Sequence, residues 1–198
     1  MPLTTISSLR VVNDPLEADR LVDVALNQLE SVSETHFNGR NFTIRDLIPL
    51  DAPGLSLYTT ATDANEWTDS TGTDNTWDDT TLWDGTPIAN DTVMEIYGIS
   101  CPLPTTTAAP NVTALRFTVG ASLRAQVDLY KILQFQSPDT AESALTSGSD
   151  LIGYLMTPII VTSSQNVKIQ QRVVTNGATH QIIFHGFVAE VQGKTLEA

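Results

Sequence analysis

The stretch NVKIQQRVVTNGATHQIIFHGFVAEV, residues 166–191, decides the fold class of this chain. Asn176-Gly177 separates two β-rich runs, and Asn-Gly is a strong hairpin signal because a type I′ turn requires positive φ at both central residues. With these residues as the loop, Ile169 faces Phe184 and Val173 faces His180. One face of the pair is then apolar and the other polar, so the stretch predicts a half-buried antiparallel hairpin. The apolar face holds Val167, Ile169, Val173, Ile182 and Phe184.

The second run changes its apolar parity at Gly186. Apolar positions are even before the glycine, as at Phe184, and odd after it, as at Phe187 and Val191. An extra residue in one strand reverses the side on which the following side chains lie. The sequence therefore predicts a β-bulge at this point of the last strand.

Further strand patterns lie upstream of the hairpin. Leu151–Val161 is apolar on both parities, which indicates a central strand, and Pro158 within it indicates an edge or a bulge. Seven or eight strands are expected in all, beginning near residues 41, 92, 112, 123, 151, 166 and 178. This number favours a mainly β fold, an antiparallel β-sandwich, with the jelly roll as the expected variant.

An N-terminal arm with one helix precedes the strands. Asp14-Pro15-Leu16-Glu17 is typical of a helix start, with Asp at the N-cap, Pro at the first helical position and Glu closing a capping box. The pattern predicts a helix over about 15–32, ended by Asn38-Gly39, whose apolar stripe covers either the chain's own sheet or a neighbouring subunit. The stripe consists of Ala18, Leu21, Val22, Ala25, Leu26, Leu29 and Val32.

Three regions divide the chain within one compact domain: the arm over 1–54, an acidic segment over 55–110, and the sandwich core over 111–198. The middle segment loses periodicity, so we expect it to be irregular with one strand at 92–99. Aromatic residues are depleted from true disorder, so we expect this segment to pack its indoles on something. It contains all three tryptophans, Trp67, Trp77 and Trp83.

The chain is strongly acidic, with 10 Lys and Arg against 23 Asp and Glu and a net charge of −13. Residues 46–115 carry no Lys or Arg. Because no basic patch is visible, we expect no binding to nucleic acid or membranes. No signal peptide and no apolar run of roughly 18 residues is visible, which predicts synthesis in a cytoplasm. Cys101 stands alone and cannot form an internal disulfide.

Patterns for catalysis and metal binding are weak. His180 and His185 lie on opposite faces of the predicted last strand, and His36 is distant in sequence, so they do not predict a zinc site. The Asp-rich run 74–85 does not match a calcium loop with its closing Glu, and no Gly-x-Ser-x-Gly motif occurs. We therefore expect no enzyme activity, cofactor or metal, while an enzyme site assembled only in three dimensions remains an alternative.

Two sets of side chains are candidates for partner binding. The indoles of the middle segment could anchor a protein partner while its carboxylates steer association, and the leucines of the helix stripe could contact a neighbouring subunit. The alternatives are that the indoles form a small core or a sugar platform, and that the helix packs on its own sheet. The predicted partner-binding residues are Trp67, Trp77, Trp83, Leu21, Leu26 and Leu29.

Three stretches of the C-terminal half carry a family resemblance: Thr157–Val161, Asn166–Thr175 and His185–Gly193. The last contains the pattern Gly-aromatic-x-x-Glu-x-x-Gly, at Gly186, Phe187, Glu190 and Gly193. These stretches resemble the jelly-roll decoration, or cement, proteins of tailed-bacteriophage heads. The resemblance covers at most residues 112–193 and does not account for the helix or the tryptophan segment.

The resemblance implies a virion structural protein of the capsid surface, without catalytic activity and often a homotrimer, whose partner is the major capsid protein. Such a protein binds the capsid shell and stabilises it. The competing hypothesis is a carbohydrate- or receptor-binding β-sandwich module of a phage or bacterial surface structure. Neighbouring genes for a capsid protein and a portal would favour the first hypothesis, and glycan binding through the tryptophans would favour the second.

Overall fold

The computed structural model describes residues 7–47, 66–68, 77–88, 90–100, 112–129, 132, 152–173 and 179–192. The helix found there is α1 (Pro15–His36). The strands are β1 (Leu9–Val11), β2 (Phe42–Asp46), β3 (Glu66–Thr68), β4 (Trp77–Pro87), β5 (Thr92–Ser100), β6 (Val112–Val119), β7 (Ser122–Asp128), β8 (Gly153–Thr162), β9 (Asn166–Val173), β10 (Thr179–Gln181) and β11 (Ile183–Val191).

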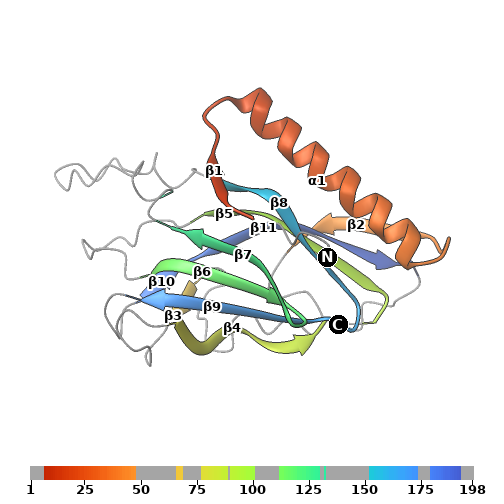
Figure 1. The fold of residues 1–198 in the computed structure, drawn as a ribbon. Helices are drawn as coiled ribbons and strands as arrows, with labels where there is room; N and C mark the ends of the chain where they lie inside the picture. The colour runs from red at the N-terminus through yellow and green to blue at the C-terminus, as the bar shows by residue number, and fades with distance from the viewer. Residues whose placement is uncertain are drawn as a thin grey trace, which may run out of the picture.

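Two antiparallel sheets pack face to face, as Figure 1 shows. The five-stranded sheet has the order β1-β8-β5-β11-β2, and the four-stranded sheet has the order β4-β9-β6-β7. β3 and β10 form a separate two-stranded sheet. The expected antiparallel β-sandwich with an N-terminal helix is therefore confirmed.

The strand pairs are nested along the chain. β6 pairs with β7, β5 with β8, β4 with β9, and β2 with β11, so each pair encloses the preceding one in sequence. Successive pairs alternate between the two sheets. The additional pairings of β5 with β11 and of β6 with β9 join these pairs into sheets.

The prediction that residues 166–191 form a hairpin is wrong, because its two strands do not pair with each other. Val173 of β9 pairs with Val112 of β6, and His180 of β10 pairs with Trp67 of β3. β9 and β11 lie in different sheets, and Asn176-Gly177 lies outside the described residues. The predicted burial is nevertheless correct at Val167, Ile169, Ile182 and Phe184. The alternation of apolar residues correctly indicated which side of β9 and of the first part of β11 is buried. It could not indicate that the two strands face the same core from opposite sheets instead of pairing in one sheet.

A register shift lies where the bulge was predicted, between His185 and Gly186, but the extra residue is in β5, because Gly98 and Ile96 pair with these two consecutive residues of β11. The predicted change of buried face in β11 is wrong: Phe184 and Val188 both lie in the core between the sheets, and Phe187 packs on the opposite face, which α1 covers. The irregularity expected around Pro158 is also present. Ile96 of β5 pairs with Ile159 of β8, but Gly98 pairs with Tyr154, so the register shifts across the segment of β8 that contains Pro158.

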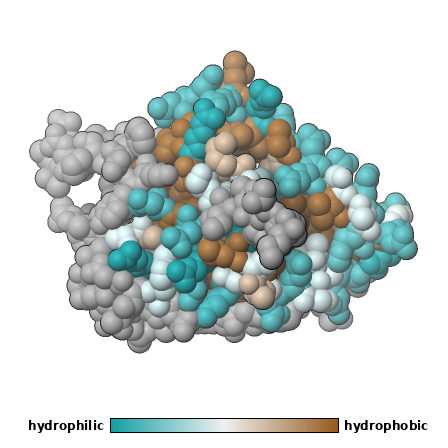
Figure 2. All heavy atoms as spheres, in the orientation of Figure 1, coloured by the Kyte–Doolittle hydropathy of each residue, from teal (hydrophilic) through white to brown (hydrophobic). Residues whose placement is uncertain are grey.

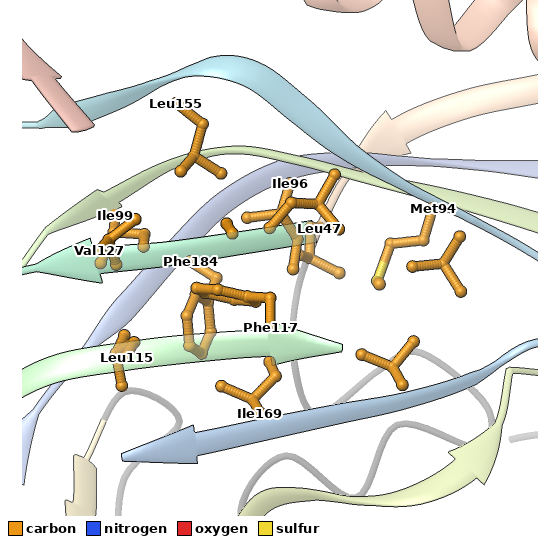
Figure 3. Close-up of a cluster of buried hydrophobic side chains, with 14 of the residues drawn as sticks. Leu47, Met94, Ile96, Ile99, Leu115, Phe117, Val127, Leu155, Ile169 and Phe184 are labelled. Atoms are coloured by element: carbon orange, nitrogen blue, oxygen red, sulfur yellow. The ribbon is translucent and has the colours of Figure 1, made fainter. Parts of the chain in front are cut away.

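The core between the sheets is apolar, as Figure 3 shows. Leu115 and Phe117 of β6 and Phe184 of β11 point into it from opposite sheets. The rings of Phe117 and Phe184 meet edge to face, with centroids 5.8 Å apart. Burying one such side chain stabilises the fold by about 1.5–3 kcal/mol, so these alternating residues hold the layers together.

Helix α1 begins where its capping residues predict. The Asp14 side chain accepts a hydrogen bond of 3.0 Å from the backbone N–H of Leu16. The helix continues past Val32 to His36, with Ser33 also buried, and it ends before Asn38 and Gly39, which both have positive φ.

The helix lies on the outer face of the five-stranded sheet (Figure 1). Its buried contact residues form a cluster with that sheet, which we call the subhelix cluster: Leu29, Phe37, Val93 and Ala189. Of the two positions considered for the stripe, the structure therefore has the helix packed on its own sheet.

The segment before α1 connects the two sheets. Ser7 forms a parallel bridge with Ala125 of β7, and its Oγ accepts a 3.0 Å hydrogen bond from the backbone N–H of Thr157. β1 then pairs with β8. The described part of the predicted arm is thus held within the chain, across the side of the sandwich where β7 and β8 lie.

The middle segment contains more regular structure than expected. β3, β4 and β5 all fall within residues 55–110, where one strand was predicted. β5 is the central strand of the five-stranded sheet, so the core is not built from residues 111–198 alone. The sequence pattern missed β4 because its Thr- and Asp-rich run lacks apolar alternation.

Candidate functional site

An aromatic strip lies on the outer face of the five-stranded sheet, and we define it as Tyr97, Tyr154, His185 and Phe187. The Tyr97 ring is 5.2 Å from that of Phe187 and 6.4 Å from those of Tyr154 and His185, measured between centroids. The strands bring these rings together because Gly98 of β5 pairs with Tyr154 on one side and with His185 on the other.

Burial governs the protonation of the strip. It raises the pKa of Tyr97, and the charges of Tyr154 and Asp46 raise that pKa further. Burial also raises the pKa of Tyr154, with a second contribution from Asp19 of α1. The pKa of His185 is lowered by burial, so its imidazole is neutral at neutral pH. The strip is therefore an uncharged surface at neutral pH.

A serine and a histidine meet at one end of this strip. The Oγ of Ser100 lies 2.8 Å from Nε2 of His185. A Ser–His contact is the first requirement of nucleophilic catalysis, which also needs a group that orients the imidazole and donors for an oxyanion. In the described ranges no carboxylate contacts His185, and Ser100 is only 3% exposed. The pair therefore fits a structural hydrogen bond better than a nucleophile.

Sequence reasoning did not identify this pair. Ser100 and His185 are 85 positions apart, and only the register between β5 and β11 brings them together. No motif in the sequence signals their contact.

Glu95 is the most unusual ionisable group in the described chain. It is 0% exposed in the central strand β5, and neither carboxylate oxygen has a hydrogen-bond partner. Burial raises its pKa from 4.5 to about 8, while the nearby backbone of Leu29 lowers it to a smaller extent. Glu95 is therefore mainly a neutral carboxylic acid at pH 7. The sequence placed it within an acidic region but gave no sign of its burial.

The three predicted tryptophans do not share one position in the fold. Trp67 lies in the two-stranded sheet, paired with His180. Trp77 and Trp83 both lie on β4, opposite Arg172 and Ile169 of β9. The side chains of Trp67 and Trp83 lie outside the described atoms, so their predicted contacts stay predictions.

Trp77 makes a cation–π contact with Arg116 of β6. The guanidinium carbon lies 4.1 Å from the centroid of the indole, and the Trp77 side chain is half-buried. Such contacts contribute roughly 0.5–2 kcal/mol depending on desolvation. One face of this indole is therefore already occupied within the chain.

Basic residues gather on the outer face of the four-stranded sheet. Arg116, Arg124, Lys168 and Arg172 are four of the ten Lys and Arg of the chain. They occupy positions that alternate with buried core residues, and Asp128 shares this face. The strand pairing thus collects basic groups that are scattered in sequence.

The predicted partner-binding leucines differ in burial. Leu29 is 0% exposed in the subhelix cluster and is occupied within the chain, whereas Leu21 and Leu26 are half-buried. On the face seen in Figure 2, polar residues surround smaller apolar areas at α1 and below it. The exposed large apolar side chains of α1 are Leu16 and Val24, which the stripe did not include.

Among the residues that the structure describes, no three His, Cys, Asp or Glu side chains lie close enough to hold a metal ion. In that part of the chain, no helix has the length and apolar character needed to cross a membrane. The sequence matches no protein-family model, and no curated protein is significantly similar to it.

Proposed function

We propose that this chain is a capsid decoration protein of a tailed bacteriophage. It is a virion structural protein that binds the outer surface of the shell, stabilises contacts between major capsid protein subunits and has no catalytic activity. It acts as a homotrimer on the capsid surface after synthesis in the host cytoplasm.

The observation that carries this proposal is the nested order of strand pairs. From the outermost pair inward, β2–β11, β4–β9, β5–β8 and β6–β7 alternate between the two sheets. This order arises when one long antiparallel hairpin wraps around a barrel, which is the jelly-roll topology common among viral capsid and lectin domains. It supports the jelly-roll variant, and with it the two function classes that the sequence favoured.

The Trp77 contact favours the capsid class over the lectin class. A sugar platform needs an indole face that is open to a pyranose ring, and the Arg116 guanidinium covers one face of Trp77. Trp and Arg are the residues most enriched at the hot spots of protein interfaces. A half-buried Trp–Arg pair on an outer sheet face therefore fits a protein partner better than a glycan.

The test is sedimentation of the purified chain with shells assembled from the major capsid protein encoded beside it. We expect saturable binding that weakens as salt rises, because acidic residues steer association through a screened field. Trp77→Ala should weaken binding more than Asp128→Asn, the control, because an aromatic anchor contributes more to an interface than a single surface carboxylate.

Absence of co-sedimentation at any salt concentration would reject the capsid proposal. Glycan-array binding that Trp77→Ala abolishes would replace it with the carbohydrate-binding alternative. Light scattering supplies the second measurement: a trimer is expected, and a concentration-independent monomer would remove the trimer from the proposal.

A further inference from the structure

We propose that Glu95 is a pH-sensitive latch for helix α1: its neutral carboxylic acid lets the helix pack on the five-stranded sheet, and its ionisation favours release of the helix. This inference concerns the fold and does not depend on the proposed function.

Glu95 lies in the interface between α1 and the sheet. Its register neighbours are Ile160 of β8 and Phe187 of β11, which both pack against the subhelix cluster. The backbone of Leu29, on the buried side of α1, lies next to the carboxyl group. The side chain is fully buried and accepts no hydrogen bond of normal geometry. An ionised carboxylate in this position would need water or a cation, and neither can enter unless the helix moves.

The titratable groups along this interface supply no cation to Glu95. Burial is the main cause of the raised pKa of Glu95, and no neighbouring charge contributes to it. His185, the one group of the aromatic strip that could become cationic, is kept neutral by burial. His36, at the end of α1, contacts Ser163 instead. The basic groups of the packed elements are engaged elsewhere or face solvent, since Arg45 of β2 pairs with Glu190 at 3.1 Å and Arg20 of α1 is exposed. The remaining groups are neutral or acidic, among them Tyr97 of β5, Tyr154 of β8, Asp46 of β2 and Asp19 of α1.

Release of α1 can occur without unfolding the sandwich. The subhelix cluster is separate from the larger apolar cluster between the sheets. Elements that pack through one face can open locally at a lower free energy than global unfolding requires. Release would uncover Val93, Ala189 and Phe187 on the sheet together with the apolar stripe of the helix.

The experiment measures thiol labelling of Ser33→Cys in the full chain, with Cys101→Ser as background. Ser33 is 0% exposed on the side of α1 that faces the sheet. After correction for thiol ionisation, we expect the labelling rate to rise about tenfold per pH unit between pH 5 and 8 and then to level off. Ala25→Cys, also fully buried on α1, is a second reporter if Ser33→Cys does not fold.

Two controls separate local release from other causes. Adding Glu95→Gln should abolish the rise in labelling, because the amide cannot ionise. Val167→Cys, in the core between the sheets, should label slowly at every pH. A corrected rate that is independent of pH, a rise that persists in Glu95→Gln, or a parallel rise at Val167→Cys would each overturn the latch.

Discussion

Gly186 of β11 lies against the backbone of Glu95 of β5 so closely that a Cβ at residue 186 would overlap the Glu95 carbonyl oxygen. The glycine at the bulge is therefore required by the approach of two backbones, and its φ is not in the positive range. This contact also fixes the segment of β5 that carries the buried carboxyl group.

We expect Gly186→Ala to lower the free energy of unfolding by about 2–4 kcal/mol, because a backbone oxygen cannot rotate away as a side chain can. Urea denaturation measures this loss. Gly120→Ala is the control: Gly120 has a φ of 59° with open space around its Cβ position, so strain of about 1 kcal/mol is expected there. Equal losses for the two variants would contradict the close approach at Gly186.

Replacement of Leu29 tests the packing of α1. Leu29→Ala should cost about 2–5 kcal/mol of stability in the isolated protein, because it leaves a cavity beneath the helix. Leu16→Ala is the matched control on the same helix; Leu16 is 78% exposed, and a change within about 0.5 kcal/mol is expected. Similar small effects at both positions, measured by urea denaturation, would mean that the stripe does not pack on the chain's own sheet.

Glu95 should make stability depend on pH. Its pKa is about 8 in the folded state against 4.5 ordinarily, so between these values the folded state holds a proton that the unfolded chain has lost. Below pH 4.5 Glu95 is protonated in both states, so its burial carries no cost of protonation there. The free energy of unfolding then falls as pH rises, by about 1.4 kcal/mol per pH unit, until pH 8.

Unfolding in urea at pH 5–9 should show Glu95→Gln gaining several kcal/mol over the native chain by about pH 8 and little near pH 5. Glu30→Gln, exposed on α1, should show no such difference. A constant difference between native chain and Glu95→Gln at every pH would rule out ionisation as the cause.

The Trp77–Arg116 contact should appear in a double-mutant cycle. Trp77→Ala, Arg116→Ala and the double variant are compared by thermal or urea unfolding. A coupling free energy of about 0.5–1.5 kcal/mol is expected from the cation–π geometry. Arg124→Ala, on the same sheet face, replaces Arg116→Ala in the control cycle, where the coupling should be near zero. Additive effects in both cycles would show that the contact carries no energy.

Local sequence determined the elements whose causes lie within a few residues. Asp14 and Pro15 define the start of α1 because a cap acts on the next backbone N–H groups. The alternation around Phe117 correctly predicted a buried face, because a strand's side chains must alternate whatever its neighbours are. The parity change at Gly186 reflects instead the burial of both faces of β11, one in the core between the sheets and the other beneath α1.

Strand partners, and the side chains that they bring together, were decided only by the tertiary structure. The hairpin signal at Asn176-Gly177 predicted that β9 and β11 pair, yet each pairs with strands far away in sequence, because an apolar face is equally well buried by a facing sheet. The contact of Ser100 with His185, the stacking of Arg116 on Trp77 and the burial of Glu95 all depend on those long-range pairings. No local pattern encodes these contacts. The distance between two side chains in a sheet depends on the register of strands that are far apart in the sequence.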